Sequence, residues 1–274
     1  MSLRLVARQP PALPVDASSL APGALAALPL ADIERLRLPH GRDTIAVAEL
    51  FEVHRADGAT RDTLVLDGDL SRFHSIGAGL ASGTIEVHGP VGDSAGLGMS
   101  AGRLVIHGRA RDLTGCAMRG GWLEVMGDIG DFGACARPGD MNGMRGGTLL
   151  VRGAAGARLG DRMRRGTVLV WGDCGDFVAS RMVAGTLVLG GRCGAHAGWG
   201  MRRGTLLFAG VAPPPPPTFV PVHSGAEVFW QLLSRELSRY GAPLADLPRR
   251  RVQRHAGDLA VGGTGEWLVV GSRQ

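Results

Sequence analysis

Four cysteines are the residues of this chain that could most readily bind a metal or form disulfides, and their spacing is regular. Cys116 and Cys135 lie 19 residues apart, and Cys174 and Cys193 repeat that separation. If residues 19 apart stack, each pair comes within reach of a disulfide bond. The two pairs occupy different positions in the repeat, whereas a zinc or iron–sulfur site needs four converging thiolates. We therefore predict two buried pairs of reduced thiols and no metal site.

A second set of residues with similar spacing could hold a transition metal or titrate near neutral pH. It consists of Asp67, His88, His107 and Met126. Two stacked imidazoles beside a carboxylate are suited to either task, but a metal needs a third close ligand. The favoured interpretation is a ladder that faces solvent or another subunit. His196 and His255 have no matching partner and are interpreted as structural or surface residues.

Arginines form the third candidate site. All 30 basic residues are Arg, and with 25 acidic residues they leave a formal net charge of +5. One position of the repeat holds Arg119, Arg145, Arg164 and Arg202, and Arg165 and Arg203 follow two of them. Stacked cations repel, so this ladder predicts contact with carboxylates, which an acidic ligand or an acidic neighbouring subunit would supply; the alternative is a solvated edge.

Several function classes find no support. Gly-x-Ser-x-Gly, His-Glu-x-x-His and Gly-x-x-x-x-Gly-Lys are all absent, so common nucleophile, zinc-protease and phosphate-loop chemistry has no motif here. Segment 20–30, the most apolar early stretch, is interrupted by Pro22, Gly23 and Pro29, and no run approaches the length of a membrane helix. We expect a cytoplasmic protein that binds neither membrane nor nucleic acid.

The elements that position these residues come from an internal repeat. Of the 274 residues, 44 are Gly, and segments that begin at a Gly advance by 19 residues, except for one that advances by 26. They begin at Gly83, Gly102, Gly121, Gly147, Gly166 and Gly185, and the last one ends at Gly204. Inside them the pattern Gly-x-x-Gly-x-x-x-Gly indicates regularly spaced sharp corners.

Five residues of strand character follow the first Gly of each repeat, and two positions among them are apolar in every repeat. The first holds Leu64, Ile85, Leu104, Leu123, Leu149, Val168, Leu187 and Leu206. The second holds Leu66, Val87, Ile106, Val125, Val151, Val170, Leu189 and Phe208. Because side chains two apart share a strand face, both columns should point inward. The position between them includes Glu86 and Glu124 and should point outward.

Four outward positions are aliphatic and in register, which would be costly in water. They are Leu150, Leu169, Val188 and Leu207. This apolar strip must be covered. Two covers remain open at this point: a helix from the C-terminal part of the chain, or a partner subunit.

One short strand and several corners per repeat predict an all-β fold, a right-handed parallel β-helix with 19-residue rungs and small α/β caps at both ends. We expect an N-terminal cap at 1–62, the β-helix at 63–211, and a proline linker, helix and tail at 212–274. The first cap should contain helices near 19–28 and 32–36 and a strand at 45–53. A capping-box pattern at 224–227 should open a helix whose Val228, Leu232, Leu233 and Leu237 share one face, with Gly241 after it.

The chain resembles a known family. The Gly-rich rungs, the Met before each rung closure, the inserted Pro138-Gly139-Asp140 and the tail from Gly257 to Glu266 are similar to the C subunits of formylmethanofuran dehydrogenases and of the bacterial formyltransferase/hydrolase complex. The rungs alone also resemble the C-terminal domain of glutamate synthase. The insertion and the tail favour the family of C subunits.

The resemblance implies a cytoplasmic complex with three other kinds of subunit. The bacterial complex is expected to move a formyl group from tetrahydromethanopterin to a methanofuran-type carrier and to release formate, as part of formaldehyde oxidation. The reacting groups should belong to other subunits, so we expect no catalytic residue and no cofactor held by this chain alone. The family's carrier has a glutamate-rich tail, which makes Arg119, Arg145, Arg164 and Arg202 candidate contacts.

Two alternatives remain. An archaeal-type enzyme of the same family is an oxidoreductase with a tungsten or molybdenum pterin. A stand-alone β-helical binding protein is the other, although its outward Thr ladder lacks the Asp or Arg clusters typical of polysaccharide lyases.

Overall fold

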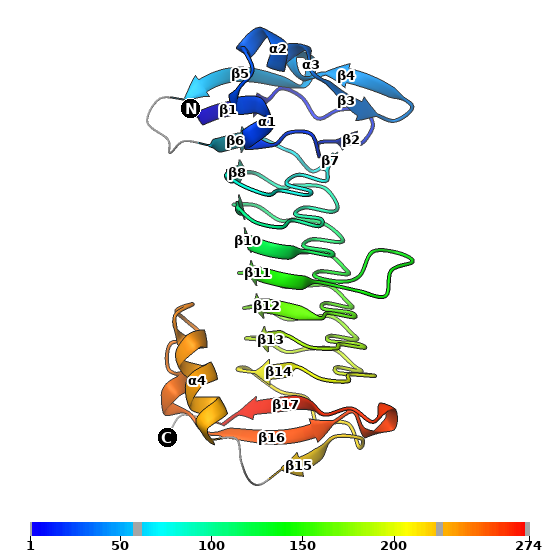
Figure 1. Ribbon diagram of the computed structural model, residues 1–274, viewed down its shortest axis with the longest axis vertical. Coiled ribbons are helices and arrows are strands. Elements are labelled where there is room, and N and C mark those ends of the chain that lie inside the picture. The colour runs from blue at the N-terminus through cyan, green and yellow to red at the C-terminus, as the bar shows by residue number, and fades with distance from the viewer. Residues whose placement is uncertain (1, 57–61, 223–226, 272–274) are drawn as a thin grey trace.

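The computed structural model describes residues 2–56, 62–222 and 227–271, and a sheet of 13 strands runs along nearly all of its length (Figure 1). Eight consecutive neighbours in this sheet are parallel and come from successive repeats, which we call rungs. They are β6 (Thr63–Asp67), β8 (Thr84–His88), β9 (Arg103–Ile106), β10 (Arg119–Val125), β11 (Arg145–Val151), β12 (Arg165–Val170), β13 (Thr186–Leu189) and β14 (Thr205–Phe208). Residues 19 apart pair directly, as Val168 does with Leu187. The predicted all-β class is confirmed.

The core lies between the strands and the corners of the rungs. Every member of the two apolar columns is fully buried, and so are the six repeated methionines from Met99 to Met201. Burial of each such side chain stabilises the fold by about 1.5–3 kcal/mol before entropy losses. Register is therefore strongly specified, because a one-residue slip would turn a whole column toward solvent.

Close contact between rungs explains the inner Gly pattern. The Asp131 carboxylate accepts a hydrogen bond from the Ala157 amide of the next rung at 2.7 Å, and a Cβ on Gly156 would overlap that carboxylate. The same arrangement recurs in four other places. The acceptors there are Asp112, Asp128, Asp173 and Asp176, which lie against Gly130, Gly153, Gly191 and Gly194. These glycines are thus needed for close approach, and the aspartates satisfy backbone amides across the gap.

The N-terminal region adds strands to the same sheet and a second, four-stranded sheet. Its elements are β1 (Ser2–Ala7), β2 (Val15–Asp16), α1 (Pro22–Ala26), α2 (Leu30–Arg35), β3 (Arg37–His40), β4 (Asp43–Ala46), α3 (Val47–Leu50) and β5 (Phe51–Ala56). Strand β1 pairs in parallel with β6 and antiparallel with β5. The small sheet has the order β4-β3-β2-β7, with β7 at Phe73–His74.

Two expectations for this region are corrected. The strand predicted over 45–53 is interrupted by α3, because the Glu49 carboxylate accepts a hydrogen bond from the Ala46 amide at 3.0 Å and closes a helical turn there. The helices predicted near 19–28 and 32–36 are α1 and α2, which are displaced and short. Pro22 begins α1, where its missing N–H costs no hydrogen bond.

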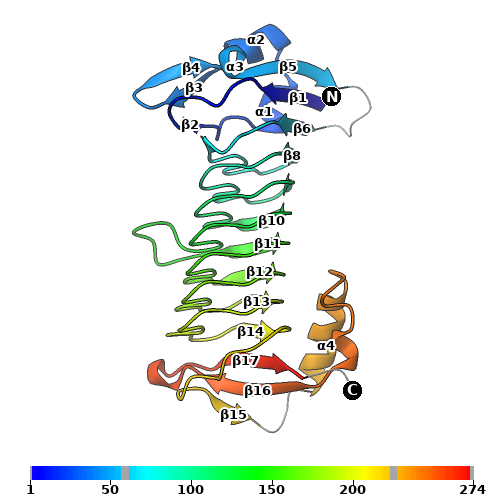
Figure 2. The ribbon, with the colours of Figure 1, turned by 180° about the vertical axis from the view of Figure 1, so that it is seen from behind.

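The C-terminal region closes the other end of the rung stack (Figure 2). Its elements are β15 (Val220–Val222), α4 (Glu227–Ser238), the 3-10 turns η1 (Leu247–Arg249) and η2 (Leu259–Val261), β16 (Val252–Gly257) and β17 (Gly265–Val270). Strand β17 continues the parallel stack beside β14, and β16 then pairs antiparallel with it. Among the described residues, no helix is long and apolar enough to cross a membrane.

Helix α4 lies beside the lower rungs in Figure 1, and the C-terminal region to which it belongs covers the apolar strip. Trp230, Leu237, Leu244 and Leu247 pack in one buried cluster with all four strip residues. The alternative in which the chain's own C-terminal segment covers the strip is therefore the correct one.

The predicted face of that helix is partly wrong. Val228 and Leu232 are 70% and 64% exposed, whereas Trp230, Ser234 and Leu237 are buried. Position 224–226 of the predicted capping box lies outside the described residues.

Candidate functional site

The arginine ladder forms a shallow groove along the rung stack, near the position where strands begin. We define the arginine groove by its lining residues, which are Arg145, Arg164, Arg165, Val183, Ala184, Arg202 and Arg203. Its volume is about 620 Å³. The structure thus brings together three of the four predicted residues, Arg145, Arg164 and Arg202. Arg119 continues the ladder one rung earlier but does not line the groove.

Buried methionines and rung-to-rung hydrogen bonds position these three arginines. Each directly follows a fully buried Met, so the alternation of side chains along an extended backbone directs the Arg outward. The Arg164 amide donates to the Met144 carbonyl at 2.8 Å, and the Arg202 amide donates to the Met182 carbonyl at 2.8 Å. At the rung between them, Val183 takes the position of the arginine.

The groove is strongly cationic. All five of its guanidinium groups are on exposed residues, and no carboxylate lines it. Within the described part of the chain, none of the five side chains makes an ion pair or a hydrogen bond. The groove can therefore bind a ligand or a partner segment with several negative charges, because bidentate Arg–carboxylate pairing is available on three rungs.

A neighbouring pocket of about 440 Å³ shares Arg164, Val183 and Arg202 with the groove. Trp199, Met141 and Val261 add exposed apolar surface to its wall. Sequence analysis missed this pocket, because its walls come from a rung corner, the inserted loop and η2. The signal available in the sequence was the seven-residue insertion itself, which needs a partner surface for Met141.

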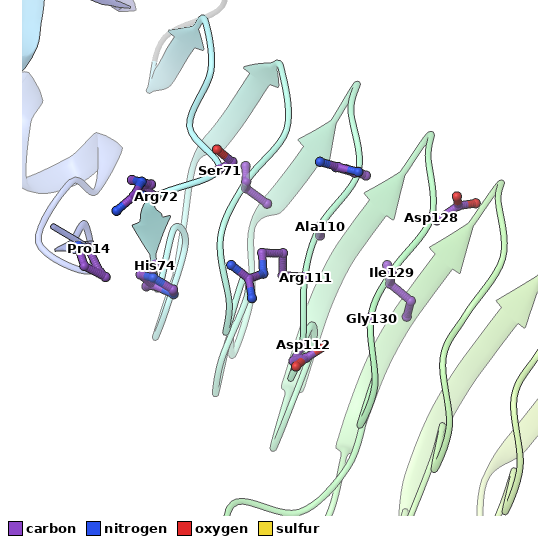
Figure 3. Close-up of a pocket in the computed structure, with 12 residues that line it drawn as sticks. Pro14, Ser71, Arg72, His74, Ala110, Arg111, Asp112, Asp128, Ile129 and Gly130 are labelled. Atoms are coloured by element: carbon purple, nitrogen blue, oxygen red, sulfur yellow. The ribbon is translucent and has the colours of Figure 1, made fainter. Parts of the chain in front are cut away.

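A third concave site lies near the N-terminal region and has a volume of about 650 Å³ (Figure 3). Arg72, His74 and Arg111 line it together with Asp112 and Asp128. Its positive charge is partly compensated.

The compensation comes from Asp93, which lies 3.3 Å from both Arg111 Nε and His74 Nδ1. Its backbone amide also donates to His74 Nδ1 at 3.0 Å. The arginine groove is therefore better suited to bind anions.

The predicted histidine column is present at the strand ends. The rings of His88 and His107 stack with centroids 4.5 Å apart. Asp67 is engaged by Arg4, whose Nε lies 2.6 Å from Asp67 Oδ2. Within the described ranges, no group of three or more His, Cys, Asp or Glu side chains is arranged to hold a metal ion. Of the other two histidines, His196 stacks on Phe177, and His255 has a buried Nδ1 for which the described residues provide no hydrogen-bond partner.

Both cysteine pairs stack, on different sides of the rungs, and all four thiols are free. The Cys116 and Cys135 sulfurs are 3.6 Å apart, and Cys135 and Cys116 are both buried. Burial raises the pKa of the Cys174 thiol to about 12 and that of Cys193 to about 11. The predicted arrangement of two stacked pairs of reduced thiols is confirmed, although Cys193 is only partly buried.

Comparisons with known proteins give three findings. No protein-family model matches the chain. Over 89 residues the chain is 31% identical to the C-type subunit of tungsten-containing formylmethanofuran dehydrogenase 2 from Methanothermobacter thermautotrophicus, which is 32% of this chain and 33% of that protein. Over 93 residues it is 33% identical to the C-type subunit of molybdenum-containing formylmethanofuran dehydrogenase 1 from Methanothermobacter marburgensis, which is 34% of this chain and 23% of that protein. These matches span a third or less of the relatives' length.

A solved structure is similar over almost the whole chain. It is the crystal structure of the formyltransferase/hydrolase complex from Methylorubrum extorquens in complex with methylofuran. The TM-score is 0.91 and the sequence identity 39%, over 98% of this chain and 100% of that chain. An identity this high over the full length covers the rungs, the insertion and both ends together.

Proposed function

The chain belongs to the family of C subunits of formyltransferase/hydrolase complexes and formylmethanofuran dehydrogenases, and we propose from this premise that it is a structural, non-catalytic subunit of a formyltransferase/hydrolase complex. The likeness over 98% of the chain to a chain of such a complex carries the proposal. The complex transfers a formyl group from tetrahydromethanopterin to a methanofuran-type carrier and releases formate. Three other kinds of subunit hold the reacting groups, and the complex works in the cytoplasm.

The second candidate is the equivalent subunit of a tungsten or molybdenum formylmethanofuran dehydrogenase. The matches to those subunits favour it, but they cover only about a third of this chain. The hydrolytic complex is the better candidate because its chain matches the N- and C-terminal regions as well.

We further infer that the rung stack is a right-handed parallel β-helix, with caps at 1–62 and 212–274 around a body at 63–211. Parallel pairing of strands 19 residues apart supports the coil, and parallel crossover connections are right-handed in almost all proteins. The antiparallel strands β5 and β16 support the caps, since they lie beyond the parallel stack at its two ends.

The arginine groove is the proposed contact for the acidic part of the carrier. Arg145, Arg164 and Arg202 would pair with successive carboxylates, and Arg119 would extend the contact by one rung. The free guanidinium groups and the lack of any lining carboxylate support this assignment. The same chemistry would suit an acidic segment of a neighbouring subunit, so the test must measure the carrier itself.

Purification of the tagged chain from its host tests the assignment to a complex. Mass spectrometry should identify three co-purifying kinds of subunit, and the complex should release formate from the formyl carrier. Co-purification with a metal-pterin subunit would support the dehydrogenase instead. A chain that purifies alone would contradict both.

Carrier content tests the groove. In the purified complex, Arg164→Ala with Arg202→Ala should lower the bound carrier roughly threefold to tenfold, because each exposed Arg–carboxylate pair contributes up to about 1 kcal/mol. The matched control, Arg35→Ala with Arg239→Ala, removes the same charge from two exposed helical ion pairs. Equal carrier content in both variants would remove the groove from the proposal.

A further inference from the structure

Four planar side chains form a continuous stack on one edge of the rung stack. We call Phe132, Arg158, Phe177 and His196 the π ladder, since each occupies the same position in its rung. The Arg158 guanidinium lies 5.9 Å from the Phe132 ring centroid and 4.8 Å from that of Phe177. The rings of Phe177 and His196 stack at 4.7 Å with an interplanar angle of 23°.

The backbone at these four positions is of a kind that folding alone would give to smaller residues. Their φ angles are +59° to +60°, in the left-handed region. Gly, Asn and Asp adopt this region most readily, whereas a bulky side chain there is strained. Strain of this kind is retained mainly at functional sites. The same rung position in the N-terminal half holds Ser75 and Ser94, so the position does not require an aromatic ring.

Exposed apolar side chains continue the π ladder. Trp199 is 53% exposed and packs edge-on against Phe177, with centroids 6.4 Å apart. Met141 and Val261, 65% and 48% exposed, line the same pocket as Trp199. This combination of Phe, Trp, Met and Arg is the composition of the energetically dominant centres of protein interfaces.

Charge identifies the kind of partner. Arg158, Arg162 and Arg181 lie on this edge, and the nearby Asp161 is almost buried and paired with Arg181 at 2.8 Å. A second copy of the chain would bring like charges together, given its net charge of +5. An acidic surface would be complementary.

We propose that the π ladder and Trp199 form a docking surface for another subunit of the complex, through a segment that carries planar or apolar side chains flanked by carboxylates. This inference rests on the proposed function, because it requires that the chain has partner subunits.

The test is Phe132→Asn with Phe177→Asn, in the full chain co-expressed with the other subunits. Asn tolerates the left-handed backbone, so the melting temperature of the chain should stay the same or rise. Retention of the partner subunit on the tagged chain should fall at least about tenfold, as expected for the loss of two interface anchors. Ser94→Asn, at the same rung position outside the π ladder, should change neither value.

Each outcome decides between the two proposals. If the wild-type chain retains no subunit, the proposed function fails first. If the wild type assembles and the double variant assembles equally well, only the docking surface is wrong. A parallel loss of melting temperature and retention, or a loss with Ser94→Asn as well, would also overturn it. Should the double variant not fold, Trp199→Ala decides in its place, and unchanged retention overturns the inference.

Discussion

Between pH 9 and pH 12 this chain has few side chains that can lose a proton, because it contains no Lys and a single Tyr. Cys174 is one of them. Its pKa rises from 9.0 to about 12 because the thiol is buried, with the neighbouring Cys193 adding to the shift. Above pH 9 the unfolded chain loses this proton while the folded chain keeps it. Stability is therefore complete below pH 9 and falls as pH rises toward 12.

We expect Cys174 to contribute a slope of up to about 1.4 kcal/mol of lost unfolding free energy per pH unit in this range. Urea unfolding from pH 6 to pH 11 should show a shallower alkaline decline for Cys174→Ala than for the wild type. Between pH 6 and pH 8 the thiol is protonated in both states, so the two curves should run parallel there. Parallel curves above pH 9 would show that the folded Cys174 ionises as easily as a free thiol.

At the level of single elements, α4 shows what a short pattern leaves undecided. It carries two apolar stripes, one through Val228 and Leu232 and one through Trp230 and Leu237, and helical periodicity alone cannot choose between them. The choice is made by contacts distant in sequence. Trp230 Nε1 donates to the Arg250 carbonyl at 2.8 Å, which turns the second stripe toward Leu169 and Leu207.

Two leucines of α4 provide a matched pair for measuring this cover. Leu237→Ala should lower the unfolding free energy by about 2–4 kcal/mol, because Leu237 is 1% exposed and the lost side chain leaves a cavity over the apolar strip. Leu232→Ala, at a residue 64% exposed on the same helix, should change it by less than about 0.5 kcal/mol. Denaturant midpoints measure both, and equal losses would mean that α4 does not pack as described.

For the whole molecule, the repeat made the rungs predictable and left the ends unpredictable. The buried columns follow from the sequence because each position is sampled eight times, once per strand. The N-terminal region is sampled once, so a single Glu49 contact was enough to convert a predicted strand into α3. The pocket of Met141, Trp199 and Val261 joins three distant segments, and no local pattern indicates that they meet.

The same periodicity makes a prediction about the architecture as a whole. Residues in a stack of rungs contact mainly the rungs on either side, so one complete rung can be removed without disturbing the rest. Deletion of residues 167–185 removes β12 and its corners and brings β11 beside β13. Leu150 would then pair with Val188 as it now pairs with Leu169, which keeps the core columns and the strip under α4 apolar.

The rung-deletion variant should fold with a β-type circular dichroism spectrum and a cooperative, somewhat lower melting transition. Deletion of residues 167–175 is the control, because removal of nine residues leaves half a rung and places corner residues where strand residues must pair. This shorter deletion should fail to fold although it removes less of the core. If the two variants behaved alike, register between rungs would not be what holds the columns together, and stability would have to come from contacts that span the molecule.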